Sequence, residues 1–270
     1  MNPLRLLLVV CLLYISCNEQ KRDDQSVIHD TVSISDINKT ALDYPVSLKQ
    51  VFRAHGRIDQ WIDMRSLTFD MLNQNKVETH TISLKDRRTK IEAEQWAIGF
   101  DGNEVWKLEQ SQNAYRGDPV FYYNLMFYFY AMPFVLADEG IIYEELKATE
   151  LEGEVFEGIR ISYNEGVGNS SKDEYILYYH PETHMMTWLA YTVTYNDDQP
   201  NKDWRYIKYS EWQEVNGLKL PKTLTWYTIQ DGKPIQARNY RNFENVTLSE
   251  TEINDSFFEM PEGATKVIRN

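Results

Sequence analysis

Alternating apolar and polar residues, interrupted by short turn sequences, fill most of the chain after residue 66. In the stretch 66–71, three apolar side chains alternate with three polar ones, which is the period of a strand with one buried face. Asp101-Gly102, Asn216-Gly217 and Asp231-Gly232 separate such stretches, and these dipeptides favour tight hairpin turns. The pattern therefore predicts about eleven antiparallel strands in one large, strongly curled sheet.

The fold class that we expect is mainly β (α+β), with a single domain at residues 41–270. Neither a repeat nor a linker rich in Pro, Gly or Ser divides the chain after residue 41. Aromatic residues make up 13% of the chain, which favours β-structure around a large apolar interior. Residues 43–54 are expected to form a short N-terminal helix, with Pro45 in its first turn. The sheet would form a half-open barrel.

One segment, residues 120–137 (VFYYNLMFYFYAMPFVLA), is apolar on every side. Asn124, Pro133 and acidic flanks without a positive anchor argue against a membrane span. In a soluble domain, such a helix must be covered on all sides. We therefore expect an apolar helical lid on the concave side of the sheet, either simply part of the core or in contact with a ligand. The ligand-binding residues predicted on it are Leu125, Met126, Phe129, Met132 and Phe134.

The N-terminus has the pattern of a secretory leader. Arg5 precedes an apolar run of about ten residues, which is shorter than the roughly 20 that a membrane span needs. Ser16-Cys17 then resembles a bacterial lipobox, although Tyr14 stands where that motif usually has Leu. We predict a signal peptide at residues 1–16, lipidation of Cys17, and a polar tether over residues 17–40. An ordinary secreted leader with a chance cysteine is the alternative.

The remaining composition limits the chemistry. Cys11 lies in the leader, so the mature chain would hold no cysteine besides Cys17, and this excludes disulfides and thiolate catalysis. The net charge of −13 disfavours binding to nucleic acid. The partners predicted are therefore an apolar or lipid ligand and, through the acylated cysteine, a membrane.

Motifs for catalysis or metal binding are absent from the sequence, and we expect no enzyme activity, no cofactor and no metal. His180 and His184 have a helical ligand spacing, but Pro181 favours a turn there. An acidic loop at residues 196–203 lacks the order of an EF-hand. A pair of carboxylates for glycoside hydrolysis is not excluded, although no spacing singles one out.

Several stretches resemble the LolA/LolB-like lipoprotein-localisation fold. They are residues 100–106 (FDGNEVW), 179–186 (YHPETHMM), 212–221 (WQEVNGLKLP) and 255–261 (DSFFEMP), the last of which looks like a final strand. Residues 124–140 (NLMFYFYAMPFVLADEG) are similar to a family of Bacteroidota lipoproteins of uncharacterised function. The resemblance covers roughly residues 45–265 and implies a half-barrel with a cavity suited to acyl chains. The resemblance assigns no binding residue of that fold to a position in this chain.

Together these features predict a non-enzymatic lipoprotein of the cell envelope, anchored in the outer membrane. It would bind an apolar or acyl-containing ligand in the concave face of the sheet. An interaction module for proteins or glycans with a filled core is the first alternative, and a hydrolase is the second.

Overall fold

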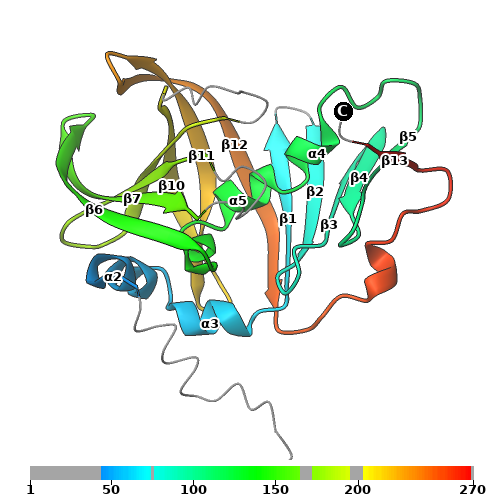
Figure 1. The fold of residues 1–270 in the computed structure, drawn as a ribbon, viewed down its shortest axis with the longest axis horizontal. Helices are drawn as coiled ribbons and strands as arrows, with labels where there is room; N and C mark the ends of the chain where they lie inside the picture. The colour runs from blue at the N-terminus through cyan, green and yellow to red at the C-terminus, as the bar shows by residue number, and fades with distance from the viewer. Residues whose placement is uncertain (1–43, 74–75, 165–171, 195–202, 269–270) are drawn as a thin grey trace, which may run out of the picture.

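The computed structural model describes residues 44–73, 76–164, 172–194 and 203–268. These residues form one antiparallel sheet of thirteen strands, β1 to β13 (Figure 1). In chain order, the strands are Ser66–Asn73, Lys76–Ser83, Thr89–Ala93, Trp96–Phe100, Val105–Glu109, Ile141–Leu151, Glu154–Tyr163, Tyr175–Tyr179, Met186–Tyr191, Arg205–Val215, Leu218–Gln230, Lys233–Ser249 and Thr265–Val267. The large antiparallel sheet expected from the sequence is confirmed, whereas the expected number of about eleven strands is too low.

The order of strands in the sheet is β13-β5-β4-β3-β2-β1-β12-β11-β10-β9-β8-β7-β6. Strands β1 to β5 and β6 to β12 are thus two meanders of successive hairpins, which β1 and β12 join by pairing Leu67 with Leu248. The sheet is open, with β13 and β6 at its edges. The three-residue strand β13, which pairs with β5, is too short to show a period in the sequence.

The turn dipeptides act as the sequence predicts. Asn216 and Gly217 have φ angles of 49° and 76°, and Asp231 and Gly232 have 53° and 74°. Two successive left-handed residues give the turn whose twist matches that of the flanking strands. These turns fix the register of β10 with β11 and of β11 with β12.

Two helices precede the sheet, α2 (Val46–Ala54) and α3 (Ile58–Asp63). The first confirms the expected N-terminal helix, and its buried side includes Leu48, Val51 and Phe52. Pro45 is its N-cap rather than a first-turn residue. The second helix has only six residues, and sequence periodicity did not indicate it. Both helices lie at the lower end of the sheet in Figure 1.

Gly56, between α2 and α3, lies against the β10–β11 turn. Its φ is +109°, and a Cβ atom there would lie 2.3 Å from the carbonyl oxygen of Gly217. Gly56→Ala is therefore expected to lower the free energy of unfolding by about 2 kcal/mol, through backbone strain and this clash. Urea denaturation measures the loss.

Gly232→Ala is the matched control for that substitution. Gly232 also has a positive φ of +74°, but a Cβ atom there meets nothing within 4 Å. Gly232→Ala should lower the free energy of unfolding by only about 1 kcal/mol, from backbone strain alone. Equal losses in the two variants would show that the approach of Gly56 to Gly217 is not tight.

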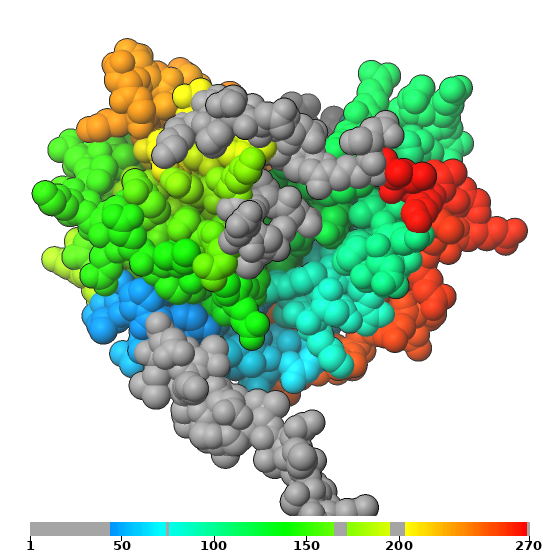
Figure 2. Space-filling view, in the orientation of Figure 1, coloured from blue at the N-terminus to red at the C-terminus, as the bar shows by residue number. Residues whose placement is uncertain are grey.

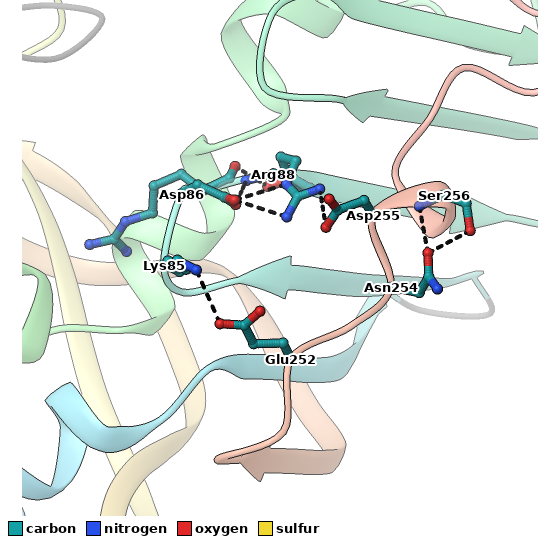
Figure 3. Close-up of polar contacts among 9 residues, drawn as sticks. Lys85, Asp86, Arg88, Glu252, Asn254, Asp255 and Ser256 are labelled. Atoms are coloured by element: carbon teal, nitrogen blue, oxygen red, sulfur yellow. Dashed lines mark hydrogen bonds and ion pairs between the residues drawn. The ribbon is translucent and has the colours of Figure 1, made fainter.

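The C-terminal segment binds the β2–β3 turn through the polar contacts drawn in Figure 3. Lys85 pairs with Glu252 at 3.2 Å, and Arg88 pairs with Asp255 at 2.9 Å. Further along, Trp106 Nε1 donates to the carbonyl oxygen of Phe258 at 3.0 Å. The expectation of a final strand at 255–261 is wrong, because residues Asp255–Phe257 form a 3₁₀ turn, η2. Side-chain contacts, rather than a ladder, hold this segment.

Apolar side chains form clusters on both faces of the sheet. The main cluster lies on the concave face, under α2, α3 and the segment that follows β5. A second cluster on the other face surrounds Trp188 and includes Phe156 and Tyr206. The β11–β12 turn reaches this second cluster, because the Tyr206 hydroxyl donates to the carbonyl oxygen of Gly232. Strands β7 to β10 consequently have buried apolar side chains on both faces.

Candidate functional site

The candidate site is the concave face together with residues 119–137, here called the insert. Strand β5 lies beside the edge strand β13, and β6 forms the opposite edge. The chain must therefore cross the sheet between them, and the insert does so over the concave face (Figure 1). The chain continues from the insert into a strand on either side, β5 before it and β6 after it. The insert is therefore held at both ends.

The insert is not the single lid helix that the sequence suggested. It consists of α4 (Pro119–Tyr122), α5 (Leu125–Tyr130) and the 3₁₀ turn η1 (Phe134–Ala137). The Asp118 carboxylate caps α4 by accepting from the backbone N–H of Val120 at 2.9 Å. Pro133 has no N–H to continue α5, which ends before it.

The predicted ligand-binding residues all belong to the insert and pack into the main core. Met126, Phe129, Met132 and Phe134 are buried, and Leu125 is half-buried. The ring of Phe129 lies 4.9 Å from that of Tyr191 and 6.2 Å from that of Trp226.

Phe134 stacks on Trp61 of α3, with 4.9 Å between the ring centroids. The structure thus brings the predicted residues together against the concave face, and their contact with a ligand stays a prediction.

Tyrosine hydroxyls attach the backbone of the insert to the rest of the fold. Tyr209 donates to the carbonyl oxygen of Phe129 at 2.7 Å, and Tyr143 donates to that of Leu136 at 2.6 Å. Tyr44 donates to that of Ala137 at 3.0 Å. Short helices leave most of their carbonyl groups without an intrahelical partner, and these hydroxyls supply one. Burial raises the pKa of Tyr209 well above its usual value, so it remains a donor at all physiological pH values.

A carboxylate and an imidazole on β2 hold the first part of the insert. The Tyr122 hydroxyl donates to Glu78 at 2.6 Å, and His80 Nε2 lies 3.5 Å from the same carboxylate oxygen. Burial by itself would raise the pKa of Glu78, but the contacts with His80 and Tyr122 and the charge of Arg241 lower it overall. The ionised carboxylate therefore accepts the Tyr122 hydrogen bond at neutral pH.

An ion pair holds the other end of the insert. Arg87, in the β2–β3 turn, pairs with Asp138 at 2.6 Å, and its guanidinium lies 4.8 Å from the ring centroid of Phe127. Burial raises the pKa of Asp138, and the charge of Arg87 opposes that rise. The insert is thus tied to the sheet on both sides of α5.

Several polar atoms near α4 and α5 are buried without a hydrogen bond. They include Oδ1 of Asn124, the hydroxyl of Tyr130 and Nδ1 of His80, whose ring stacks on Phe69 at 4.8 Å. An unsatisfied buried polar atom costs roughly 1–3 kcal/mol. The packing beside α4 and α5 is therefore less favourable than that of a fully apolar core.

No pattern in the sequence indicated the roles of Glu78, His80, Arg87 and Tyr209. Glu78 and His80 are two apart on a strand and so share a face, which is a readable but unspecific signal. Their partners on the insert are 42 or more residues away, and only the strand order brings them close.

Groups that could hold a metal ion are absent from the described part of the chain, where no three His, Cys, Asp or Glu side chains gather. His180 Nδ1 instead accepts from the backbone N–H of Glu182 at 3.2 Å, within a turn. Residues 196–202 of the acidic loop lie outside the described residues, as does Cys17. Within the described residues, no helix has the length and apolar character needed to cross a membrane.

Residues 4–239 match the model of a family of unknown function, DUF6503. The chain belongs to this family. That membership confirms the expectation of an uncharacterised family. The comparison with curated proteins gave no match.

Among solved structures, the chain is similar to a LolA superfamily protein from Nitrosomonas europaea, with 8% identity and a TM-score of 0.45 over 80% of this chain and 99% of that one. A putative outer membrane lipoprotein-sorting protein domain from Vibrio parahaemolyticus has 7% identity and a TM-score of 0.42, over 74% of this chain and 93% of that one. The structure of the Pseudomonas aeruginosa MucA/MucB complex has a chain with 8% identity and a TM-score of 0.23, over 82% of this chain and 64% of that one.

Proposed function

We propose that this protein is a non-enzymatic lipoprotein of the cell envelope, anchored in the outer membrane through acylated Cys17. Its concave face binds an apolar or acyl-containing ligand when the middle of the insert, α5, moves aside. The observation that carries the proposal is the position of α5, which lies between two tethered ends and places Met126 and Phe129 in the core.

The pieces of the insert are short enough to move separately. Helices of four to six residues are not stable without tertiary contacts, so α5 keeps its position through its packing, the Tyr209 hydrogen bond to Phe129 and the hydrogen bond between the Tyr128 and Tyr163 hydroxyls. If α5 moves outward, it uncovers apolar walls that include Tyr191 and Trp226. An acyl chain bound there compensates for the lost contacts, because each CH₂ group that it buries contributes about 0.8 kcal/mol of favourable free energy.

The experiment titrates cis-parinaric acid, a fluorescent fatty acid, into the chain that starts at Asn18. Removing the leader leaves the described core intact, because that core begins at Tyr44. Saturable binding is expected. Tyr209→Phe deletes the hydrogen bond to Phe129, worth about 1 kcal/mol, and should strengthen apparent binding about fivefold by favouring the open insert.

Tyr206→Phe is the matched control. It lies on the same strand and loses the same kind of bond, to Gly232, but on the opposite face of the sheet. Its affinity for the fatty acid should equal that of the wild type. If none of the three proteins binds the probe, or if both variants change the affinity alike, the proposal is wrong.

A second function, a protein- or glycan-binding module with a filled core, has one observation in its favour. Ile235 and Tyr240, on the β12 side of the β11–β12 hairpin, are 52% and 61% exposed. Exposed apolar and aromatic side chains are common at interaction surfaces. An absence of fatty-acid binding, with cross-linking of this hairpin to an envelope component in intact cells, would favour this function.

A further inference from the structure

Two arginines lie beside the aromatic pair that Phe129 of the insert covers. The rings of Tyr191 and Trp226 lie next to that of Phe129, and Trp226 Nε1 donates to the Tyr191 hydroxyl at 3.1 Å. Arg205, the first residue of β10, is paired with Tyr191 across the sheet. Because residues opposite each other on neighbouring strands point to the same side, Arg205 lies on the concave face.

A bulge in β12 brings Arg238 to the same place. The register of β11 with β12 shifts here, and Arg238 is the extra residue beside Asn239, which pairs with Trp226. Bulges redirect a side chain and are common next to functional sites. Burial raises the pKa of Tyr191, while the Trp226 hydrogen bond and the positive charges of Arg205 and Arg238 oppose that rise. Both guanidinium groups are therefore close enough to the Tyr191 hydroxyl to act on it.

These two arginines have no carboxylate partner in the part of the chain that the structure describes. None of the ion pairs between described residues includes Arg205 or Arg238. Arg241, further along β12, differs from them because its charge acts on the carboxylate of Glu78. In a protein with a net charge of −13, a pair of such guanidinium groups favours an anion at this place.

The arginines lie at the border between the apolar core and the solvent. Phe129 and Tyr191 are buried, whereas Arg205 and Arg238 are exposed. The β11–β12 hairpin, to which Arg238 belongs, projects from the surface of the molecule and is drawn in orange in Figure 2. A charged group is costly to bury, so an acyl ligand under α5 would keep its head at this border. The planar guanidinium group fits a carboxylate or a phosphate through two parallel hydrogen bonds.

We propose that Arg205 and Arg238 bind the negatively charged head of the acyl ligand, while its chain lies under α5 against Tyr191 and Trp226. The inference rests on the proposed function and names the class of ligand that the concave face takes. That class is an acyl lipid with one anionic head, a carboxylate or a phosphate, and it leaves out neutral lipids of the same chain length.

The test compares cis-parinaric acid with its methyl ester, which has the same fluorescent chain but no charge. The chain that starts at Asn18 should bind the acid about tenfold more tightly than the ester. Arg205→Gln and Arg238→Gln should each weaken binding of the acid about fivefold, as for the loss of one exposed ion pair. Neither variant should change binding of the ester, because the apolar walls stay intact.

Lys233→Gln is the matched control, because it removes the same charge from the same hairpin. Lys233 is exposed and follows Gly232, whose carbonyl oxygen accepts from Tyr206 on the opposite face of the sheet. This variant should keep the preference of the wild type for the acid, and circular dichroism checks that all variants are folded. Equal affinity of the wild type for acid and ester, or equal losses in Arg238→Gln and Lys233→Gln, would overturn the inference.

Competition with bound cis-parinaric acid distinguishes a carboxylate head from a phosphate head. The competitors are oleate, oleoyl lysophosphatidate and monooleoylglycerol, which share one acyl chain. Stronger displacement by oleate assigns a carboxylate, stronger displacement by the lysophosphatidate assigns a phosphate, and equal displacement by neutral monooleoylglycerol contradicts the inference. The two proposals fail in different ways: equal binding of acid and ester leaves the proposed function standing, whereas binding of neither removes both.

Discussion

Replacing Phe134 by alanine is expected to lower the free energy of unfolding by about 3–5 kcal/mol. Its side chain is completely buried, and its ring stacks on that of Trp61 with an angle of 9° between the planes. The contact joins the end of the insert to α3, so the cavity left by the alanine is walled by two separate elements. Elements that are fixed by their own contacts relax little into such a cavity.

Chemical denaturation of the wild type and the variant measures this loss. Tyr240→Ala removes an aromatic ring that is mostly exposed, and it should change the free energy of unfolding by less than about 1 kcal/mol. If Phe134→Ala also lowered the free energy of unfolding by less than about 1 kcal/mol, the end of the insert would not belong to the cooperative core. In that case the whole insert, rather than α5 alone, would have to move as the lid.

The sheet could be predicted from the sequence because its signals are local. Alternation of apolar and polar residues and turns such as Asn216-Gly217 depend on neighbours in the chain, and both predictions are confirmed. Two elements were missed, α3 and β13, because six and three residues are too few to show a period. The pairing of β1 with β12 joins residues that are far apart in sequence, and no local pattern encodes it.

The candidate site was predictable only in part. The apolar run that contains Phe129 marks buried residues, but a segment apolar on all sides has no period from which to read a helix boundary. Tertiary contacts decide its breaks, as when Tyr209 donates to the carbonyl oxygen of Phe129 from 80 residues away. Glu78 and Tyr122 meet for the same reason, since the strand order places the insert above β2.

Acidification is expected to destabilise the protein through His55. This side chain is fully buried, its Nδ1 donates to the carbonyl oxygen of Val51 at 2.7 Å, and its Nε2 accepts from the backbone N–H of Met186 at 3.4 Å. Burial lowers the pKa of His55 from 6.5 to about 4, the charge of Lys219 adds to the decrease, and the Val51 carbonyl opposes it. The folded protein therefore holds this imidazole neutral.

The unfolded chain takes up this proton near pH 6.5 and the folded protein only near pH 4, so stability falls as the pH decreases between these values. The whole loss is about 3 kcal/mol, of which about 2 kcal/mol occurs between pH 7 and pH 5. Below pH 4 this histidine makes no further difference. Carboxylates with a lowered pKa, such as Glu78, lose their contribution mainly below about pH 4.5 and so affect this window little.

His55→Asn isolates the contribution of this one imidazole. The asparagine amide can still donate to the carbonyl oxygen of Val51, but it does not titrate. Denaturation at pH 7 and pH 5 should show that the wild type loses about 2 kcal/mol more than the variant over this interval. Parallel losses in the two proteins would contradict the low pKa and place a protonated imidazole inside the fold. The variant itself should be less stable than the wild type at pH 7, because it leaves the backbone N–H of Met186 without its acceptor.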